Sequence, residues 1–268
     1  MRAAGGAPPR PSAESSADRR PLAFFLLVLL LSLPFAVAGW LTGAMLLPGL
    51  PVAAMQAVCP AVAAVVLVAI RTGRAGVAAF LRRAFTAWPR GVQWPILLLG
   101  PPVLLAVVWL LQRALGVPVP LPGVDVGRIA VLFAVFLVSA VTEELGWSSY
   151  ALEPLRDRWG PLVAAVVIGL AWAAMHVLAL VQAGRDWRWI AWWVVTTLAL
   201  RMLLVVIFAR TGGGVMGVSL FHASYNVAWQ SYPESGSYWD PALVGPVFAV
   251  VAAAAMVVDR RRRQGAVA

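Results

Sequence analysis

The chain is poor in the residues from which soluble enzymes build their surfaces and sites. Its 268 residues include one cysteine, two histidines and 11 acidic residues, and charged residues make up only 12% of the sequence. All 21 basic residues are arginines, so lysine is absent. The single thiol, Cys59 in an apolar run, excludes an internal disulfide and a cysteine cluster for a metal, and its expected role is packing. The scarcity of charge excludes an ordinary soluble domain.

Long hydrophobic runs dominate the sequence instead. Hydrophobic residues make up 62% of the chain, and runs of about 20 apolar residues recur, each long enough to cross a bilayer core of ~30 Å as a helix. These runs lie at about 22–46, 50–70, 94–112, 128–147, 161–182, 189–209, 214–230 and 241–258. We therefore expect an all-α fold, a polytopic membrane helix bundle of about eight transmembrane helices.

The arginines concentrate at the two ends of the chain and in alternate connections. The connection 71–90 holds five arginines, whereas the connection 231–240 holds none. The positive-inside rule then predicts that both termini are cytoplasmic, in a multi-pass protein of a bacterial plasma membrane. No basic stripe is interleaved with exposed aromatic residues, so the net charge of +10 predicts the lipid bilayer as a partner and no nucleic acid.

Composition divides the chain into three parts. Residues 1–20 are rich in Ala, Gly, Pro, Ser and Arg and predict a disordered cytoplasmic tail. A transmembrane helical domain follows over 21–259, with the candidate motifs in 128–230, and 260–268 forms a basic cytoplasmic tail. Four tryptophans lie at the start of the span 189–209 and predict an interfacial aromatic belt. These residues are Trp187, Trp189, Trp192 and Trp193.

Several titratable residues lie inside apolar segments. Glu143 and Glu144 follow the apolar run Ile129–Val141, and both histidines, His176 and His222, are surrounded by apolar residues. An ionised side chain in hydrocarbon is costly unless it faces a bundle interior or a watery cavity. These residues are therefore candidates for a functional site.

Their spacing allows them to meet. Glu143 lies 17 positions before Gly160 and His176 lies 16 after it, so a hairpin turn at Gly160 places both about 25 Å along their helices at 1.5 Å per residue. The helix that carries Glu143 must then continue past its apolar part to the turn, with Pro154 as a possible kink. His222 and Asn226 are four residues apart and share one helical face.

Such a pocket can activate water. A carboxylate beside an imidazole can accept a proton from water, while a second imidazole and an amide stabilise an oxyanion. The same residue types can instead bind zinc, with Glu143, His176 and His222 as ligands, because two histidines and one glutamate form a hydrolytic zinc site. Both mechanisms remain open on this ground alone.

The motifs resemble those of the CPBP family of intramembrane endopeptidases, which includes CAAX prenyl protease 2 and bacteriocin-processing (Abi) proteins. Three motifs occur in order, and they are Glu143-Glu144, Trp172-x-x-x-His176 and His222-x-x-x-Asn226. The resemblance covers about residues 50–230. It implies a glutamic peptidase without a cofactor that hydrolyses a membrane-associated, possibly prenylated, peptide or protein.

The resemblance also implies roles for the residues. Glu143 activates water with His176, while His222 and Asn226 bind the oxyanion and Glu144 is a supporting acid. Two positions depart from the family pattern. Ser148 stands where the family has an arginine, and Trp172 replaces a phenylalanine. We hypothesise that Arg201, in the middle of another span, supplies the missing charge to Glu144.

Two further classes of protein remain compatible with the sequence. One is a catalytically inactive immunity or chaperone-like relative that lost activity with its arginine. The other is a transporter that uses glutamate and histidine as a proton relay, although the chain has no two-half repeat.

Overall fold

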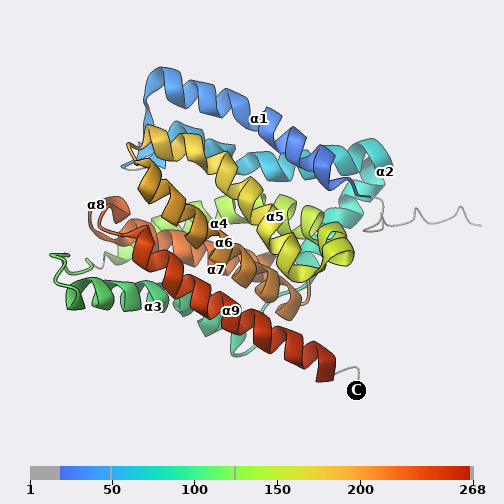
Figure 1. The fold of residues 1–268 in the computed structure, drawn as a ribbon. Helices are drawn as coiled ribbons and strands as arrows, with labels where there is room; N and C mark the ends of the chain where they lie inside the picture. Colours follow the sequence, from blue (N-terminus) through green and yellow to red (C-terminus); the bar gives the residue numbers. More distant parts are fainter. Residues whose placement is uncertain (1–18, 49, 124, 266–268) are drawn as a thin grey trace, which may run out of the picture.

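The computed structural model describes residues 19–48, 50–123 and 125–265, and they form an all-α bundle, as expected (Figure 1). The long helices are α1 (Pro21–Thr42), α2 (Cys59–Thr86), α3 (Gln93–Ala114), α4 (Val126–Gly146), α5 (Leu152–Gln182), α6 (Trp187–Arg210), α7 (Val215–Ser231) and α9 (Pro241–Gly265). The short elements are β1 (Met45–Leu47), β2 (Leu50–Pro51), the 3-10 helix η2 (Val52–Val58), the π-helical turn η3 (Trp147–Ala151) and α8 (Pro233–Gly236). The structure says nothing about residues 1–18, in which most of the expected tail lies.

Six helical segments within the described residues are long and apolar enough to cross a membrane. One of them covers Val126–Gln182, where α4, η3 and α5 follow one another directly and the backbone is non-helical at Gly160. With α4 to α5 counted as one helical segment, the described residues have about seven long helices rather than the expected eight. The seventh, α7, falls below the length of a span. It lies inside the bundle against α3, α4 and α6, and 12 of its 17 residues are buried.

The first two spans differ from the expected boundaries. Helix α1 ends at Thr42 rather than near residue 46, because Gly43 adopts a left-handed conformation (φ 60°) that closes the helix. The β1–β2 hairpin and η2 then lead into α2. Helix α2 breaks at Gly73 (φ 65°, ψ −168°), and the arginine-rich segment continues as a helix from that break to Thr86.

The connection between the two motif-bearing helices is kinked at Gly160, as predicted. Its backbone has φ 79° and ψ 167°, which is far from helical and readily adopted by glycine. Pro154 lies near the start of α5, directly after the π-helical turn η3, and it has no N–H to donate to the carbonyls of the preceding turn. The irregularity lies just before it, at η3.

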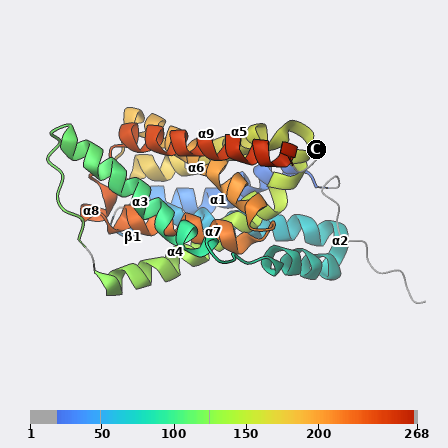
Figure 2. The same ribbon diagram turned by 90° about the horizontal axis from the view of Figure 1, so that it is seen from below.

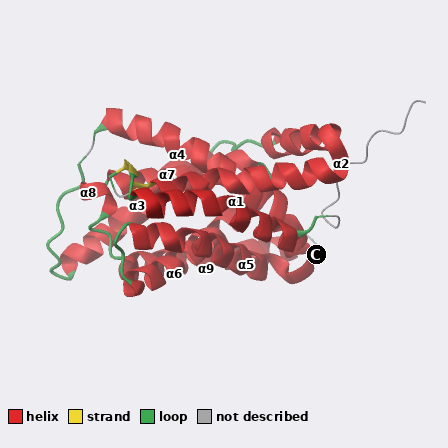
Figure 3. Ribbon diagram, turned by 90° about the horizontal axis from the view of Figure 1, so that it is seen from above, coloured by secondary structure: helices red, strands yellow, loops and turns green. Residues whose placement is uncertain are grey.

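The two chain ends lie at the same end of the bundle. Figure 2 shows the start of α1 and the C-terminal end of α9 together, and Figure 3 shows the β1–β2 hairpin at the opposite end. This arrangement agrees with termini on one side of a membrane. Helix α9 continues to Gly265, so residues 260–265 extend a helix instead of forming a separate tail. Arg19, assigned to the N-terminal tail, is buried and bonds to Glu153 (3.0 Å).

Candidate active site

The two adjacent glutamates lie at the end of α4, where that helix packs closely against α2 and η2. Glu143 is 3% exposed and Glu144 is fully buried. Thr142 donates a hydrogen bond from its hydroxyl to the Ala57 carbonyl (3.0 Å), which ties α4 to η2. A Cβ atom on Gly146 would lie 2.5 Å from Pro60, so glycine permits the close approach of α4 to α2. Neighbouring positions on a helix point about 100° apart, so the two carboxylates meet different surroundings.

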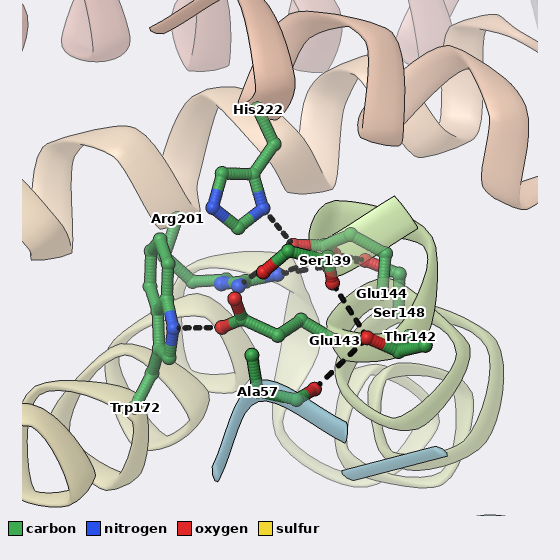
Figure 4. Close-up of polar contacts among 9 residues, drawn as sticks. All are labelled: Ala57, Ser139, Thr142, Glu143, Glu144, Ser148, Trp172, Arg201 and His222. Atoms are coloured by element: carbon green, nitrogen blue, oxygen red, sulfur yellow. Dashed lines mark hydrogen bonds and ion pairs between the residues drawn. The ribbon is translucent and has the colours of Figure 1, made fainter. Parts of the chain in front are cut away.

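Glu144 accepts hydrogen bonds from three different elements (Figure 4). Arg201 from α6 donates from Nη1 to Oε2 (2.8 Å) and from Nη2 to Oε1 (3.0 Å), a bidentate pair. His222 from α7 contacts Oε1 through Nδ1 at 3.1 Å. The Ser148 hydroxyl also donates to Oε2. Charge-assisted bidentate pairs are among the strongest polar contacts in proteins, so this carboxylate links α4, α6 and α7.

Ser148 stands where the family pattern has an arginine, and Arg201 from α6 supplies the guanidinium that pairs with Glu144 instead. Its guanidinium is fully buried, as is the Glu144 side chain, and Nη1 also lies 3.5 Å from the Ser148 hydroxyl. The ion pair expected from the sequence is therefore present. Gly169 in α5 makes room for this part of α6, because a Cβ there would lie 2.8 Å from Leu198 and 3.4 Å from the Arg201 Cβ.

Glu143 points to a different partner. The indole Nε1 of Trp172 donates to Glu143 Oε2 at 2.5 Å, as Figure 4 shows. Within the described residues, no other group donates a hydrogen bond to this carboxylate, and its Oε1 atom receives none. Glu143 therefore keeps one oxygen for a ligand or a water molecule.

Hydrogen bonds constrain both histidine rings. His176 Nδ1 lies 2.8 Å from the Trp172 carbonyl, which can only accept, so Nδ1 carries a proton and a neutral ring keeps a lone pair on Nε2. His222 Nδ1 faces the Glu144 carboxylate, so this nitrogen also carries a proton. In both rings Nε2 is the nitrogen left for chemistry.

One cavity brings the candidate residues together. It has a volume of about 180 Å³ and is lined by Glu143, His176, His222 and Asn226, which come from α4, α5 and α7. Aromatic side chains also line it, among them Trp172, Trp193, Tyr225 and Trp229. A polar cavity of this volume has room for several water molecules. Glu144 lies behind this wall and reaches the cavity through His222.

This part of the chain matches a known family. Residues 125–228 match the model of the type II CAAX prenyl endopeptidases, described as Rce1-like. The match supports the CPBP/CAAX protease family. It covers all three motifs, and it supports an intramembrane CAAX-type protease in general. Among the curated proteins, none matches the chain.

The zinc alternative depends on which atoms of the candidate site are left to ligate an ion. Among the residues that the structure describes, no three His, Cys, Asp or Glu side chains are grouped so that they could hold a metal ion. Glu143 Oε2 and Nδ1 of each histidine are engaged in hydrogen bonds, so Glu143 Oε1 and the two Nε2 atoms are the ones that could ligate an ion. The three residues line one cavity, and zinc stays an alternative hypothesis.

Two tryptophans of the candidate site have roles that sequence reasoning missed. Trp172 is a hydrogen-bond donor to Glu143 rather than a neutral exchange of one aromatic ring for another. The available signal was the indole N–H itself, which usually finds a partner when buried. Trp193, assigned to an interfacial belt, lines the cavity with its ring centroid 5.5 Å from that of His176. The spacing of residues within α6 could not show that Trp193 faces His176 on α5.

Proposed function

We propose that the protein is an intramembrane endopeptidase in which Glu143 and His176 activate a water molecule. The observation that carries this proposal is the shared cavity, which one carboxylate, two imidazoles and one amide from three helices line together. In a medium of low dielectric constant, these groups act on a reacting peptide bond more strongly than they would in water.

The hydrolytic step requires a proton acceptor and oxyanion donors. Glu143 takes a proton from water as the oxygen attacks the peptide carbonyl, and His176 orients the water through Nε2. The carbonyl oxygen becomes negative and receives hydrogen bonds from Nε2 of His222 and from the Asn226 amide. The proton then passes to the leaving amine, so the bond to nitrogen breaks and two products with free termini remain.

Glu144 and Arg201 support His222 in this mechanism. Donation from both nitrogens requires His222 as an imidazolium, and Glu144 Oε1 faces its Nδ1 at 3.1 Å. With His222 charged, the two carboxylates balance Arg201 and His222, so the buried site carries no net charge. A site without net charge avoids the large cost of an unpaired buried ion.

The substrate in this proposal is a membrane-associated peptide or protein, and a prenyl group near its C-terminus is the feature that the family description names. The family match supports that class. The cavity of about 180 Å³ accommodates the backbone and a side chain near the cleaved bond, so a lipid chain must lie outside it. No specific observation favours an inactive relative or a transporter.

Substitution of the proposed base tests this function. Purified protein in detergent is given an internally quenched peptide that ends in a farnesylated C-terminal motif. We expect Glu143→Gln to lower kcat by about 10²–10⁴-fold, the usual contribution of a general base, with circular dichroism and gel filtration unchanged. Cleavage that survives this substitution would exclude Glu143 as the base. Loss of cleavage with a chelator, restored by zinc, would contradict the metal-free mechanism.

A further inference from the structure

We propose that Trp172 is a positioning residue for the hydrolytic step. Its indole N–H holds one oxygen of Glu143, so that the other oxygen alone receives the proton from water, and its ring face supports the relocated Arg201. This inference rests on the proposed function and assigns a role that the family pattern, with phenylalanine at this position, does not contain.

One side chain contacts four members of the site. Trp172 is 4% exposed, and its Nε1 lies 2.5 Å from Glu143 Oε2. Its ring meets that of His222 edge-on, with the centroids 5.0 Å apart, and that of His176 with the centroids 5.8 Å apart. The guanidinium carbon of Arg201 lies 4.6 Å from the indole centroid. Movement of this ring would disturb all four groups.

The indole nitrogen determines which carboxylate oxygen acts. Indole N–H donates and cannot accept, so Glu143 Oε2 remains an acceptor throughout the reaction. The proton from water is therefore taken by Oε1, which receives no hydrogen bond from the described residues. A glutamate side chain has three rotatable bonds, and without this donor the carboxylate would turn among several orientations in the cavity.

The same ring links the two departures from the family pattern. Arginine is attracted to the face of an aromatic ring, and tryptophan binds a cation more strongly than phenylalanine does. Arg201 approaches Glu144 from α6 across the face of Trp172. A tryptophan at 172 therefore stabilises an arginine that comes from α6, so the two exchanges belong together.

Replacement of the N–H alone tests the hydrogen bond. In β-(3-benzothienyl)alanine, sulfur replaces the indole N–H while the size and shape of the ring are retained. We expect Trp172→β-(3-benzothienyl)alanine to lower kcat by roughly 10–100-fold, the order expected when a catalytic group loses its orientation, with KM changed less than about twofold. Trp172→Phe lowers kcat at least as far. A wild-type kcat in the benzothienyl variant would overturn the positioning role.

Trp109 provides a matched control. It also donates through its indole N–H, to the Pro120 carbonyl at 2.9 Å, and an arginine also lies over its ring, with the Arg113 guanidinium carbon 5.1 Å from the centroid. It lies on α3, outside the site. The benzothienyl exchange at Trp109 should leave kcat and KM unchanged. An equal loss at both positions would mean that the exchange acts on stability and would overturn the proposal.

A spectroscopic measurement tests the contact independently of turnover. With ¹⁵N-labelled indole groups, the Trp172 N–H signal is assigned as the one absent from Trp172→Phe. We expect Glu143→Gln to move this signal upfield, because an amide oxygen is a weaker acceptor than a carboxylate. An unmoved signal would overturn the inference while the proposed function stands. Wild-type protein that cleaves no peptide would overturn the proposed function, and the signal would still report whether the contact exists.

Discussion

Glu143 and Glu144 are neighbours in the chain, yet each meets a different set of groups. Glu144 faces one arginine, one histidine and one hydroxyl, whereas Glu143 faces an indole N–H and a cavity. The first arrangement satisfies a buried carboxylate, and the second leaves it an oxygen to react. The surrounding helices therefore place Glu144 in a supporting position and Glu143 in a reactive one, although the two side chains are identical.

Removal of Arg201 should destabilise the protein through Glu144. Arg201→Ala leaves a fully buried carboxylate without its cation, which costs about 3–5 kcal/mol when one partner of a buried pair is lost. Denaturant titration in detergent, followed by circular dichroism, measures the free energy of unfolding. Arg113→Ala is the control, because Arg113 contacts an aromatic ring and no described carboxylate. We expect a change below about 1 kcal/mol there.

A second arginine should rescue that loss. In Arg201→Ala, the added substitution Ser148→Arg returns a cation four residues from Glu144, within reach along one helix. We expect it to recover at least half of the lost stability and to restore cleavage of the quenched peptide. Arg201→Ala protein with wild-type stability and turnover would contradict the role given to the pair.

At the scale of elements, the acids depend on a close crossing of α4 and α2 and on the π-helical turn that follows. π-helical turns often occur at functional sites, where they change the direction of side chains. Apolar periodicity predicted α4, and Gly160 was correctly expected to mark the turn in the chain. The π-helical turn η3 was not predicted, because its sequence, WSSYA, has no pattern that separates it from an α-helix.

Gly146→Ala should disturb the crossing of α4 and α2. Its new methyl group would lie 2.5 Å from the Pro60 backbone and ring, and such overpacking typically costs about 1–3 kcal/mol. Gly127→Ala in the same helix is the control, since its nearest contact would lie at 3.4 Å. We expect a drop in melting temperature in the first variant only. Equal melting temperatures would show that the crossing relaxes without cost.

For the whole molecule, composition and charge predicted the bundle and the common location of its ends. Span number was less predictable, since α4 and α5 run together and α7 is short and buried. Pairwise contacts between distant helices, such as that of Trp172 with Glu143, depend on how the helices rotate against one another. No pattern within one helix specifies that rotation. The ion pair of Arg201 with Glu144 was anticipated because a charged residue in the middle of an apolar span needs a partner.

Cysteine labelling should report the orientation of the bundle. The one native cysteine, Cys59, is 2% exposed, so the wild type provides an almost unreactive background. Gln264→Cys places a thiol at an exposed position near the C-terminal end of α9, and Leu121→Cys places one at an exposed position between α3 and α4. Figure 2 shows these two parts of the chain at opposite ends of the bundle. In cells, a membrane-impermeant maleimide should label Leu121→Cys directly and Gln264→Cys only after permeabilisation. The reverse order would contradict a cytoplasmic C-terminus.

The exchange of position 148 for position 201 as the source of the cation has an evolutionary consequence. Loss of the arginine beside a buried carboxylate costs about 3–5 kcal/mol, so the order of the two substitutions matters, and the arginine at 201 is expected to come before the loss of the arginine at 148. This order passes through a chain with arginine at both positions, after which the arginine at 148 became dispensable. Present-day descendants of such an intermediate would carry two arginines beside one acid.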